Sequence, residues 1–242
     1  MTGRAGVVLA AGLGTRLRPL TDLRPKALCP VDNVPLVDLA IARVRPWVGE
    51  MAVNVHAGRE QMEAHLAGRD VHLSVEEELL GTAGALGRLR EWIAGRPVLL
   101  ANADAWHRFD LTDFVEGWDG ERPRLLVVRD EAQGDFGPWR YVGAALLSWS
   151  DVASLEPVPS ALDWKARDVD LCPVTGEFYD CGTPADYLDA NLAASGGRSV
   201  VGEGAQVDGD VVRSVVWPGA VVAAGERLVD AIRADGVTVQ VL

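Results

Sequence analysis

The sequence has no uninterrupted apolar run of roughly 18–20 residues, the length that crosses a membrane. Its N-terminal apolar stretch is cut short at Gly12, which also argues against a signal peptide. Cysteine is scarce, with three residues and no CxxC spacing. Neither a disulfide framework nor a zinc site is therefore predicted, and we expect a cytoplasmic protein without a membrane partner.

Positive charge is in short supply as well. The 242 residues include 23 Lys and Arg against 35 Asp and Glu, a net charge of −12. Binding to nucleic acid, which depends on clustered cations, is therefore not expected. Residues 1–30 are the exception, because they hold five basic residues and the single acid Asp22. This segment is suited to an anionic ligand.

Apolar runs typical of buried strands alternate with segments of helical periodicity. The expected strands lie at residues 7–11, 52–55, 71–75 and 97–104, and the helices between them at 34–47, 59–67 and 83–93. This order predicts a doubly wound, mostly parallel α/β sheet of Rossmann-like type. Further strands are expected at 125–128 and 141–147, and a helix at 185–195. Ligands of such sheets bind at the carboxyl ends of the strands, where segments 12–26 and 102–104 fall.

The end of the chain has a different texture, rich in Val and Gly. Two segments, 201–207 and 216–222, share the pattern V-x-x-G-A-x-V fifteen residues apart. Such a period is typical of a β-helix, in which each apolar residue stacks on the previous coil; an ordinary β-meander is the alternative. We therefore expect a main domain over 1–197 and a short β-helix-like tail over 198–242.

The most specific signal is the segment from Ala10 to Lys26, which reads AAGLGTRLRPLTDLRPK. Glycines let backbone amides approach phosphate oxygens, while Arg16 and Lys26 add a forked donor and a mobile point charge. A dinucleotide-binding fingerprint would need glycine where Leu17 stands, and the P-loop pattern is absent. The segment therefore predicts phosphate binding and disfavours hydride transfer and P-loop ATPase chemistry.

Four blocks, taken in order, resemble the nucleotidyltransferases that make nucleoside-diphosphate sugars from sugar 1-phosphates, among them the mannose-1-phosphate guanylyltransferases. They are residues 10–26, LGTAGAL at 80–86, LANAD at 100–104 and YDCGTPADY at 179–187. The likeness covers most of the main domain, and the tail resembles the short left-handed β-helix of several members. It implies transfer of a nucleoside monophosphate from a nucleoside triphosphate to a sugar 1-phosphate, with release of pyrophosphate.

The resemblance also implies which residues bind the nucleoside triphosphate. They are Ala10, Ala11, Gly12, Leu13, Gly14, Thr15, Glu76, Gly81 and Thr82. Arg16 would stabilise charge on the departing pyrophosphate, and Lys26 would contact the α-phosphate or the sugar phosphate. Asp104 and Asp180 match two family aspartates that hold Mg²⁺, a hard ion that prefers carboxylate and phosphate oxygens.

Glu76 stands shortly before the loop glycine Gly81, at a position where the family often has a glutamine that reads the base. An ionised carboxylate can only accept hydrogen bonds, which suits guanine, tolerates uracil and thymine, and disfavours adenine and cytosine. We therefore expect GTP to be preferred. One alternative is that Glu76 belongs to a solvated acidic run with Glu77 and Glu78. Another is that backbone groups around Gly12 and Gly81 select the base.

The sugar-phosphate side departs from the family. Many members carry Glu-Lys-Pro between the third and fourth blocks, and this chain has no such tripeptide there. The candidates for binding the sugar phosphate are Asn102, Arg140, Gly143 and Lys165. Arg140 or Lys165 would replace the missing lysine, and Gly143 matches a family glycine whose backbone lies against the sugar.

The favoured function is therefore a Mg²⁺-dependent nucleotidyltransferase acting on GTP and a mannose-like sugar 1-phosphate. A uridylyltransferase for an amino-sugar 1-phosphate and a phosphocholine cytidylyltransferase stay open within the same chemistry. A catalytically silent regulatory paralogue that binds nucleotide sugars would be expected to lose Arg16, Lys26 or the two aspartates, and all are present. A D-x-D glycosyltransferase would have no use for the segment from Arg16 to Lys26. A homo-oligomer, with the tail as subunit contact, is a further alternative.

Overall fold

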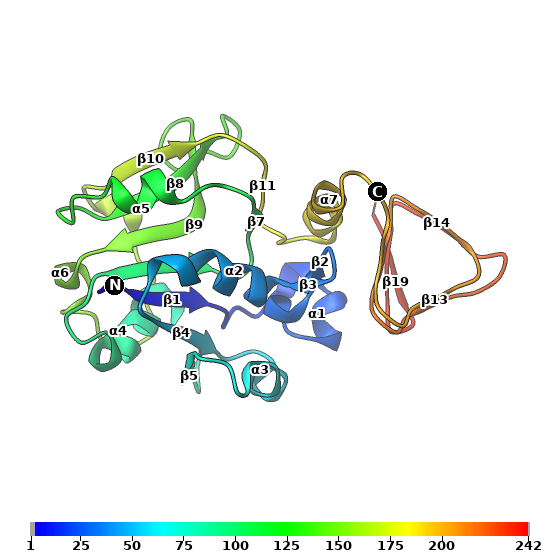
Figure 1. Cartoon of the computed structure of the whole chain (residues 1–242), viewed down its shortest axis with the longest axis horizontal. Coiled ribbons are helices and arrows are strands. Elements are labelled where there is room, and N and C mark those ends of the chain that lie inside the picture. Colours follow the sequence, from blue (N-terminus) through cyan, green and yellow to red (C-terminus); the bar gives the residue numbers. More distant parts are fainter. Residues whose placement is uncertain (1–2, 242) are drawn as a thin grey trace. The chain divides into compact units, whose positions relative to one another are not determined.

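A computed structural model describes residues 3–241 of the chain, which fall into two compact units (Figure 1). Unit 1 comprises Met1–Gly12, Ala40–Ala103 and His107–Phe178. Unit 2 comprises Leu13–Leu39, Asp104–Trp106 and Tyr179–Leu242. Within the described residues, no helix is long and apolar enough to cross a membrane.

Unit 1 is built on one seven-stranded sheet. Its strands, in spatial order, are β10 (Asp170–Val174), β8 (Arg124–Arg129), β9 (Trp139–Leu147), β6 (Val98–Asn102), β1 (Ala5–Leu9), β4 (Glu50–Val55) and β5 (His72–Val75). Neighbouring strands run parallel except β9, which is antiparallel to both β6 and β8. The predicted doubly wound, mostly parallel sheet is therefore confirmed.

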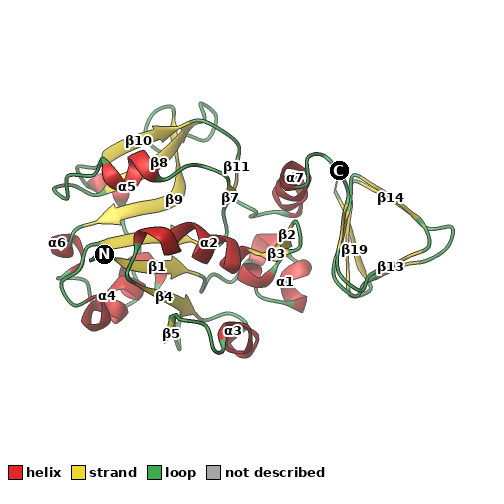
Figure 2. Cartoon of the chain, viewed as in Figure 1, coloured by secondary structure: helices red, strands yellow, loops and turns green. Residues whose placement is uncertain are grey.

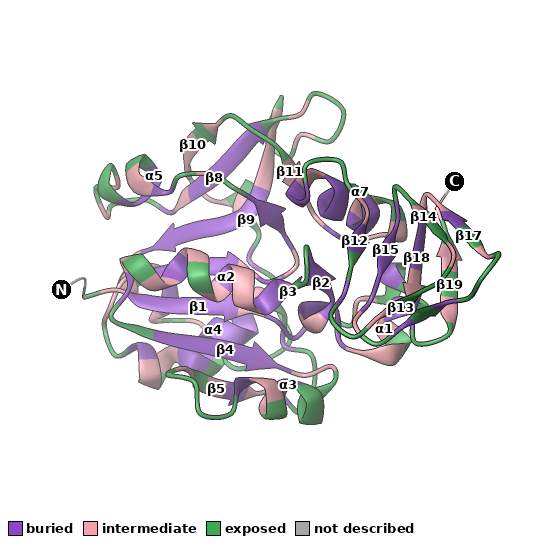
Figure 3. Ribbon diagram, turned by 45° about the vertical axis from the view of Figure 1, so that its right-hand side comes forward, coloured by how far each residue is buried: buried purple, intermediate pink, exposed green. Residues whose placement is uncertain are grey.

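Helices cover both faces of this sheet, as crossover connections between parallel strands require. The α-helices that alternate with its strands are α2 (Leu36–Val44), α3 (Arg59–Leu66), α4 (Gly81–Ile93), α5 (Thr112–Glu116) and α6 (Trp149–Val152). Two 3-10 helices accompany them, η3 (Arg45–Trp47) and η4 (Trp164–Ala166). On one face, α4 packs its apolar residues against alternate residues of β1 and β6. On the other face, the side chains of Val44 and Val48 pack directly against the backbone of Gly6. A Cβ on Gly6 would lie 2.9 Å from both side chains, so a larger residue would not leave room for them. The central strands β1, β4 and β9 are consequently buried along most of their length (Figure 3).

The expected strands and helices recur with small shifts of their ends, and the first strand shows why such shifts occur. It ends at Leu9 rather than at Ala11. The amide of Ala10 leaves the sheet ladder and donates instead to the side chain of Asn54, 2.7 Å away. The edge strand β10 was not expected from the sequence. It contains Pro173, which an edge position tolerates because its outer side needs no ladder hydrogen bond.

Unit 2 combines short elements with the C-terminal tail. They are η1 (Thr15–Leu17), α1 (Leu20–Leu23), η2 (Lys26–Leu28), β2 (Pro30–Val31), β3 (Val34–Pro35) and α7 (Pro184–Ala194), followed by β12 (Val200–Val201), β13 (Gln206–Val207), β14 (Asp210–Val212), β15 (Val215–Val216), β16 (Val221–Val222), β17 (Arg227–Val229), β18 (Ala231–Ala234) and β19 (Val237–Gln240). Strands β7 (Trp106–His107) and β11 (Phe178–Tyr179) pair with each other in a two-stranded sheet. Figure 2 shows how little helix the tail contains.

The tail is a β-helix whose coils stack in the register that the repeat predicts. Val201 pairs with Val216 and Val207 with Val222, both in parallel strands. These are the repeat positions separated by fifteen residues, so the period of the sequence equals one coil. Viewed end on, the stacked coils outline a triangle (Figure 1).

The tail also shares a hydrophobic core with the rest of unit 2. Trp217 and Tyr187 are fully buried in one cluster that includes Leu17 and Leu20. The Trp217 Nε1–H donates to the Tyr187 hydroxyl at 3.0 Å, and that hydroxyl donates to the carbonyl of Pro30. The domain boundary expected between residues 197 and 198 does not coincide with the limits of the two compact units, and it stays a prediction.

Candidate active site

The glycines of the first block serve different purposes. Gly14 has a left-handed backbone with φ of +63°, and a Cβ there would lie 2.8 Å from Thr21 Cγ2 and 3.0 Å from Lys26 Cβ. The Thr21 hydroxyl donates to the Gly14 carbonyl at 2.9 Å. Gly14 therefore lets the loop fold back against the residues around Lys26. Gly12 is exposed and has nothing within 4 Å of its Cβ position, so the structure leaves the space in front of it open.

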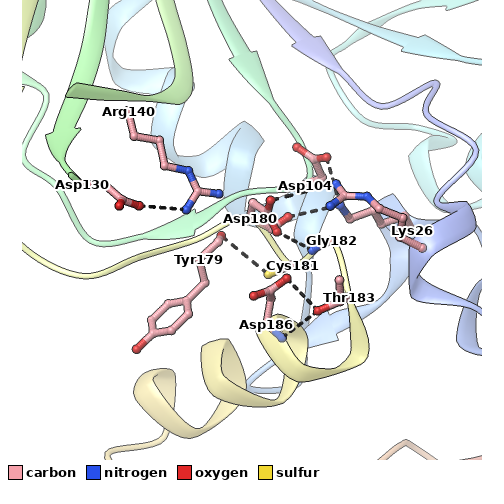
Figure 4. Close-up of polar contacts among 11 residues, drawn as sticks. Lys26, Asp104, Asp130, Arg140, Tyr179, Asp180, Cys181, Gly182, Thr183 and Asp186 are labelled. Atoms are coloured by element: carbon pink, nitrogen blue, oxygen red, sulfur yellow. Dashed lines mark hydrogen bonds and ion pairs between the residues drawn. The ribbon is translucent and has the colours of Figure 1, made fainter. Parts of the chain in front are cut away.

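Lys26 is the centre of a polar cluster in unit 2 (Figure 4). It is the first residue of η2, directly after Pro25, and its side chain is only 9% exposed. Its Nζ donates to Asp104 Oδ2 at 3.0 Å and to the backbone carbonyl of Asp180 at 3.1 Å. A buried ammonium needs such partners, because an unpaired buried charge is costly. The cluster thus joins three of the predicted site residues.

Asp180 brings the fourth predicted residue, Arg16, to the same cluster. The Arg16 Nη2 lies 4.0 Å from Asp180 Oδ2, and Asp180 Oδ1 accepts a hydrogen bond of 2.7 Å from the Gly182 amide. A Cβ on Gly182 would lie 2.7 Å from Asp180 Oδ1 and 2.8 Å from Arg16 Nη2. A side chain at this position would have to displace the ends of the Asp180 and Arg16 side chains, so glycine lets both approach the backbone as they do here. Thr183 then caps α7, since its hydroxyl accepts from the Asp186 amide.

The two carboxylates of the cluster have the chemistry that Mg²⁺ prefers. The side chains of Asp104 and Asp180 keep 46% and 29% of their surface exposed. No group of three or more acidic, histidine or cysteine ligands occurs among residues 3–241. Mg²⁺ is commonly held by only one or two carboxylates together with substrate phosphates and water, so the pair fits the ion.

Two buried cysteines of unit 2 do not supply a thiolate nucleophile. Burial raises the pKa of the Cys181 thiol well above its usual range, and burial raises the pKa of Cys29 to about 12. Both thiols therefore stay protonated near neutral pH and act as apolar core residues.

The part of the predicted nucleotide site that belongs to unit 1 contains a buried carboxylate. Glu76 is 3% exposed, whereas its neighbours Glu77 and Glu78 are exposed. Glu76 Oε1 accepts from Asn54 Nδ2 at 2.8 Å, and Oε2 accepts from the Leu80 amide at 3.1 Å. Glu76 is thus not part of a solvated acidic run. Both of its oxygens have protein partners in unit 1, and its contact with a base stays a prediction.

The glycines of the second block accommodate a backbone segment that the sequence did not reveal. Gly81 has φ of +67°, and a Cβ on it would lie 2.6 Å from the Ser160 carbonyl oxygen. That carbonyl accepts from the amides of Ala83 and Gly84, at the start of α4, at 3.1 and 3.4 Å. The spacing of three between Gly81, Gly84 and Gly87 was the available signal, because it clears one face of the helix. Thr82 is half-buried between them.

The predicted sugar-phosphate residues of unit 1 fall into separate places. Gly143 has φ of +83°, and a Cβ on it would lie 2.9 Å from the Cβ of Asn102, so these two residues are in contact. Arg140 is on the same strand as Gly143; its Nη1 lies 3.4 Å from Asp130 Oδ2, and its guanidinium lies 5.1 Å from the centroid of the Phe178 ring. Lys165 is exposed on η4.

Asp130 is a residue that the sequence analysis missed. Hydrogen bonds from backbone amides, chiefly that of Gln133, and then the Arg140 guanidinium lower the pKa of its carboxyl. Asp130 therefore stays ionised and can orient Arg140. Nothing in the spacing of these two residues along the sequence distinguishes Asp130 from an ordinary turn residue.

Comparison with known proteins gives the family of the chain. Residues 5–137 match the model of the family described as Nucleotidyl transferase. The chain is 38% identical over 173 residues to the N-acetylmuramate alpha-1-phosphate uridylyltransferase of Caulobacter vibrioides, covering 64% of this chain and 72% of that protein. It is 37% identical over 231 residues to a mannose-1-phosphate guanyltransferase of Debaryomyces hansenii, covering 77% of this chain and 63% of that protein.

A solved structure shares the fold. HddC from Yersinia pseudotuberculosis, complexed with GMP-PN, superposes with a TM-score of 0.65 at 19% identity, covering 79% of this chain and 99% of that chain. The chain therefore belongs to the nucleotidyl transferase family. Its class is that of the sugar-1-phosphate nucleotidyltransferases, as the four sequence blocks indicated.

Proposed function

We propose that the chain transfers a nucleoside monophosphate to a sugar 1-phosphate at the cluster of Arg16, Lys26, Asp104 and Asp180. The observation that carries the proposal is the pair of contacts made by Lys26 Nζ, with Asp104 Oδ2 at 3.0 Å and the Asp180 carbonyl at 3.1 Å. A phosphate oxygen of the sugar 1-phosphate attacks the α-phosphorus, the bond from that phosphorus to the bridging oxygen breaks, and pyrophosphate leaves. Positioning and charge neutralisation supply most of the acceleration in such transfers, so no protein nucleophile is needed.

The residues of the cluster divide this work. Lys26 contacts the α-phosphate or the sugar phosphate, and Arg16 meets the charge that grows on pyrophosphate as it departs. Asp104 and Asp180 would hold Mg²⁺, which neutralises phosphate charge when bound. Lys26 lies beside the Asp104 carboxylate and Arg16 beside the Asp180 carboxylate, so the two cations balance the charge of the two acids. The amides of segment 10–15 and of Gly81 and Thr82 take the nucleoside triphosphate.

For the base, we place UTP first. The 38% identical relative is named a uridylyltransferase, and the partnered carboxylate of Glu76 no longer supports the preference for GTP that its acceptor character suggested. The corresponding acceptor is an N-acetylated amino-sugar 1-phosphate. GTP with a mannose 1-phosphate is the second candidate, favoured by the 37% identical relative. Cytidylyl transfer to phosphocholine has no comparable support.

For the acceptor, Arg140 is the residue that we place at the sugar phosphate instead of the lysine of the missing tripeptide. It is held by the Asp130 carboxylate and the Phe178 ring, whereas Lys165 is exposed. A guanidinium held in this way loses less conformational freedom when it binds phosphate. Asn102 and Gly143, which contact each other, complete the proposed sugar side. The cytoplasmic location and a homo-oligomeric state stay predictions.

The test is a matrix of substrates. Purified protein with Mg²⁺ is offered UTP, GTP, dTTP, CTP and ATP, each with N-acetylglucosamine 1-phosphate, N-acetylmuramate 1-phosphate, mannose 1-phosphate or phosphocholine, and pyrophosphate and the sugar nucleotide are quantified. We expect the highest rate with UTP and an N-acetylated amino-sugar phosphate. Highest activity with GTP and mannose 1-phosphate would select the second candidate, and nucleotide-sugar binding without pyrophosphate would indicate a regulatory protein.

A further inference from the structure

Three neighbouring strands of unit 1 have their carboxyl ends side by side. Strands β1, β4 and β5 are neighbours and parallel, with Leu9 opposite Asn54 and Val55 opposite Val75. Because parallel strands present their carboxyl ends at one edge, the next residues, Ala10 and Glu76, lie on either side of β4 at that edge. Both begin loops to which the proposed function gives nucleotide contacts.

One chain of hydrogen bonds connects these two loops through β4. The Ala10 amide donates to Asn54 Oδ1 at 2.7 Å, and Asn54 Nδ2 donates to Glu76 Oε1 at 2.8 Å. The Leu80 amide donates to Glu76 Oε2 at 3.1 Å. Asn54 and Glu76 are 3% exposed each, so the chain is shielded from water. The orientation of the Asn54 side chain follows from this chemistry, because the Ala10 N–H can only donate and therefore must face Oδ1.

The backbone of Glu76 is fixed as firmly as its side chain. Its amide donates to the Val55 carbonyl at 2.8 Å, and its carbonyl lies 3.0 Å from His56 Nδ1, which donates to it as the N–H tautomer. A residue held at the amide, the carbonyl and both carboxylate oxygens has no freedom to turn toward a ligand. These contacts suit a residue that holds the loop beginning at Ala10 and the loop containing Leu80 at a fixed separation.

We propose that Asn54 and Glu76 are a positioning pair that sets the separation of the backbone at Ala10 from the backbone at Leu80. The inference rests on the proposed function, since it is the nucleoside triphosphate that needs both loops in register. Glu76 acts on every triphosphate alike through Leu80 and, by way of Asn54, through Ala10. It does not select the base.

The donors and acceptors of the pair predict the effect of each substitution. In Glu76→Gln, one amide nitrogen faces either Asn54 Nδ2 or the Leu80 N–H, so one donor meets another donor whichever way the amide turns. Turning Asn54 as well only moves the conflict to Ala10. In Asn54→Asp, two carboxylate oxygens face each other. Each single change therefore leaves one buried conflict, which costs about 1–3 kcal/mol.

The double variant Asn54→Asp/Glu76→Gln reverses the direction of the central bond and restores the whole chain. The carboxylate introduced at position 54 would accept from Ala10 with one oxygen and from the amide introduced at position 76 with the other. The oxygen of that new amide would accept from Leu80. Side-chain shapes and net charge are the same as in the wild type, so this variant isolates hydrogen-bond polarity.

The experiment compares the wild type, both single variants, the double variant and the control Glu77→Gln, whose side chain is exposed. Steady-state kinetics with UTP, GTP, dTTP, CTP and ATP are combined with amide exchange at Ala10 and Leu80 and thermal melting. We expect each single variant to raise KM for every accepted triphosphate by about tenfold, with the order of preference unchanged. Exchange at Ala10 or Leu80 should quicken in the singles. The double variant should return KM to within about threefold of the wild type.

The outcomes separate this proposal from the proposed function. A changed order of base preference in Glu76→Gln, or a double variant as impaired as the singles, would overturn the positioning role. If wild-type protein forms no pyrophosphate with any triphosphate, the proposed function fails, whereas amide exchange still tests the pair by the same rescue. If the single variants do not fold, a double variant that melts like the wild type supports the pair, and one that also fails to fold refutes it.

Discussion

The hydrogen bonds from Trp217 to Tyr187 and on to Pro30 provide a quantitative test of how the tail is held in unit 2. Trp217 and Tyr187 are fully buried, and burial raises the pKa of Tyr187 far above its usual range, so the hydroxyl keeps its proton and donates to Pro30. Trp217→Phe removes the donor to Tyr187 and leaves a small cavity. We expect it to cost about 2–3 kcal/mol of the free energy of unfolding, from one lost bond and the missing ring atoms.

Tyr187→Phe leaves two groups without partners, the Trp217 Nε1–H and the Pro30 carbonyl. Each unsatisfied buried group costs about 1–3 kcal/mol, so we expect about 2–6 kcal/mol for this variant. In the double variant the indole N–H is gone, and its penalty disappears with it. The double variant should therefore be more stable than the sum of the singles predicts, by about 1–2 kcal/mol.

The assay is a urea titration followed by circular dichroism, with hydrogen exchange of the α7 amides used to identify the transition of unit 2. Near neutral pH, the four proteins of the cycle give the coupling free energy directly. Costs that add to within about 0.5 kcal/mol would refute the reasoning, because independent sites add to that accuracy. Additivity would mean that burial of the two rings, without the bond between them, holds the tail.

Three further predictions concern charge and domain organisation. Arg16→Gln should lower kcat for pyrophosphate release by about 10²–10³-fold with little change in the KM for triphosphate. Arg18 lies in the same loop and is exposed to a similar extent, so the control Arg18→Gln should keep wild-type kinetics. Burial and then a neighbouring guanidinium lower the pKa of His107 to about 2, while the unfolded chain binds that proton below about pH 6.5. Below that pH, the free energy of unfolding should therefore decrease more steeply in the wild type than in His107→Gln, by up to about 1.4 kcal/mol per pH unit. Urea titration measures this difference, and His65→Gln is the control. Deletion of residues 199–242 should give insoluble or inactive protein, measured by expression and pyrophosphate release, because it uncovers the core of unit 2; soluble, active protein would contradict this.

The features that local spacing controls were predictable from the sequence. The fifteen-residue repeat predicted the pairing of Val201 with Val216, because one period is one coil of the β-helix. The order of strands and helices predicted the parallel sheet. It also placed the segments that contain Lys26 and Asp104 at the carboxyl ends of the strands, and the structure shows these two side chains in contact. Periodicity and motif spacing were sufficient for these features.

Features that depend on partners far apart in the sequence were not predictable. Glu76 was expected at the base, and its burial depends on Asn54, which reads as an ordinary strand residue. The packing of the Ser160 carbonyl against Gly81 likewise joins segments whose sequences carry no sign of each other. Asp130 could not be separated from other turn acids until the structure placed it beside Arg140.

The central claim is that the cluster around Lys26 carries out nucleotidyl transfer, and the most direct test is pyrophosphate release by Lys26→Met. Its Nζ is the atom that contacts both Asp104 and the backbone of Asp180. With folding verified by circular dichroism and saturating substrates, we predict a rate lower than that of the wild type by about 10²-fold or more. A folded Lys26→Met variant that releases pyrophosphate at the wild-type rate would contradict the account.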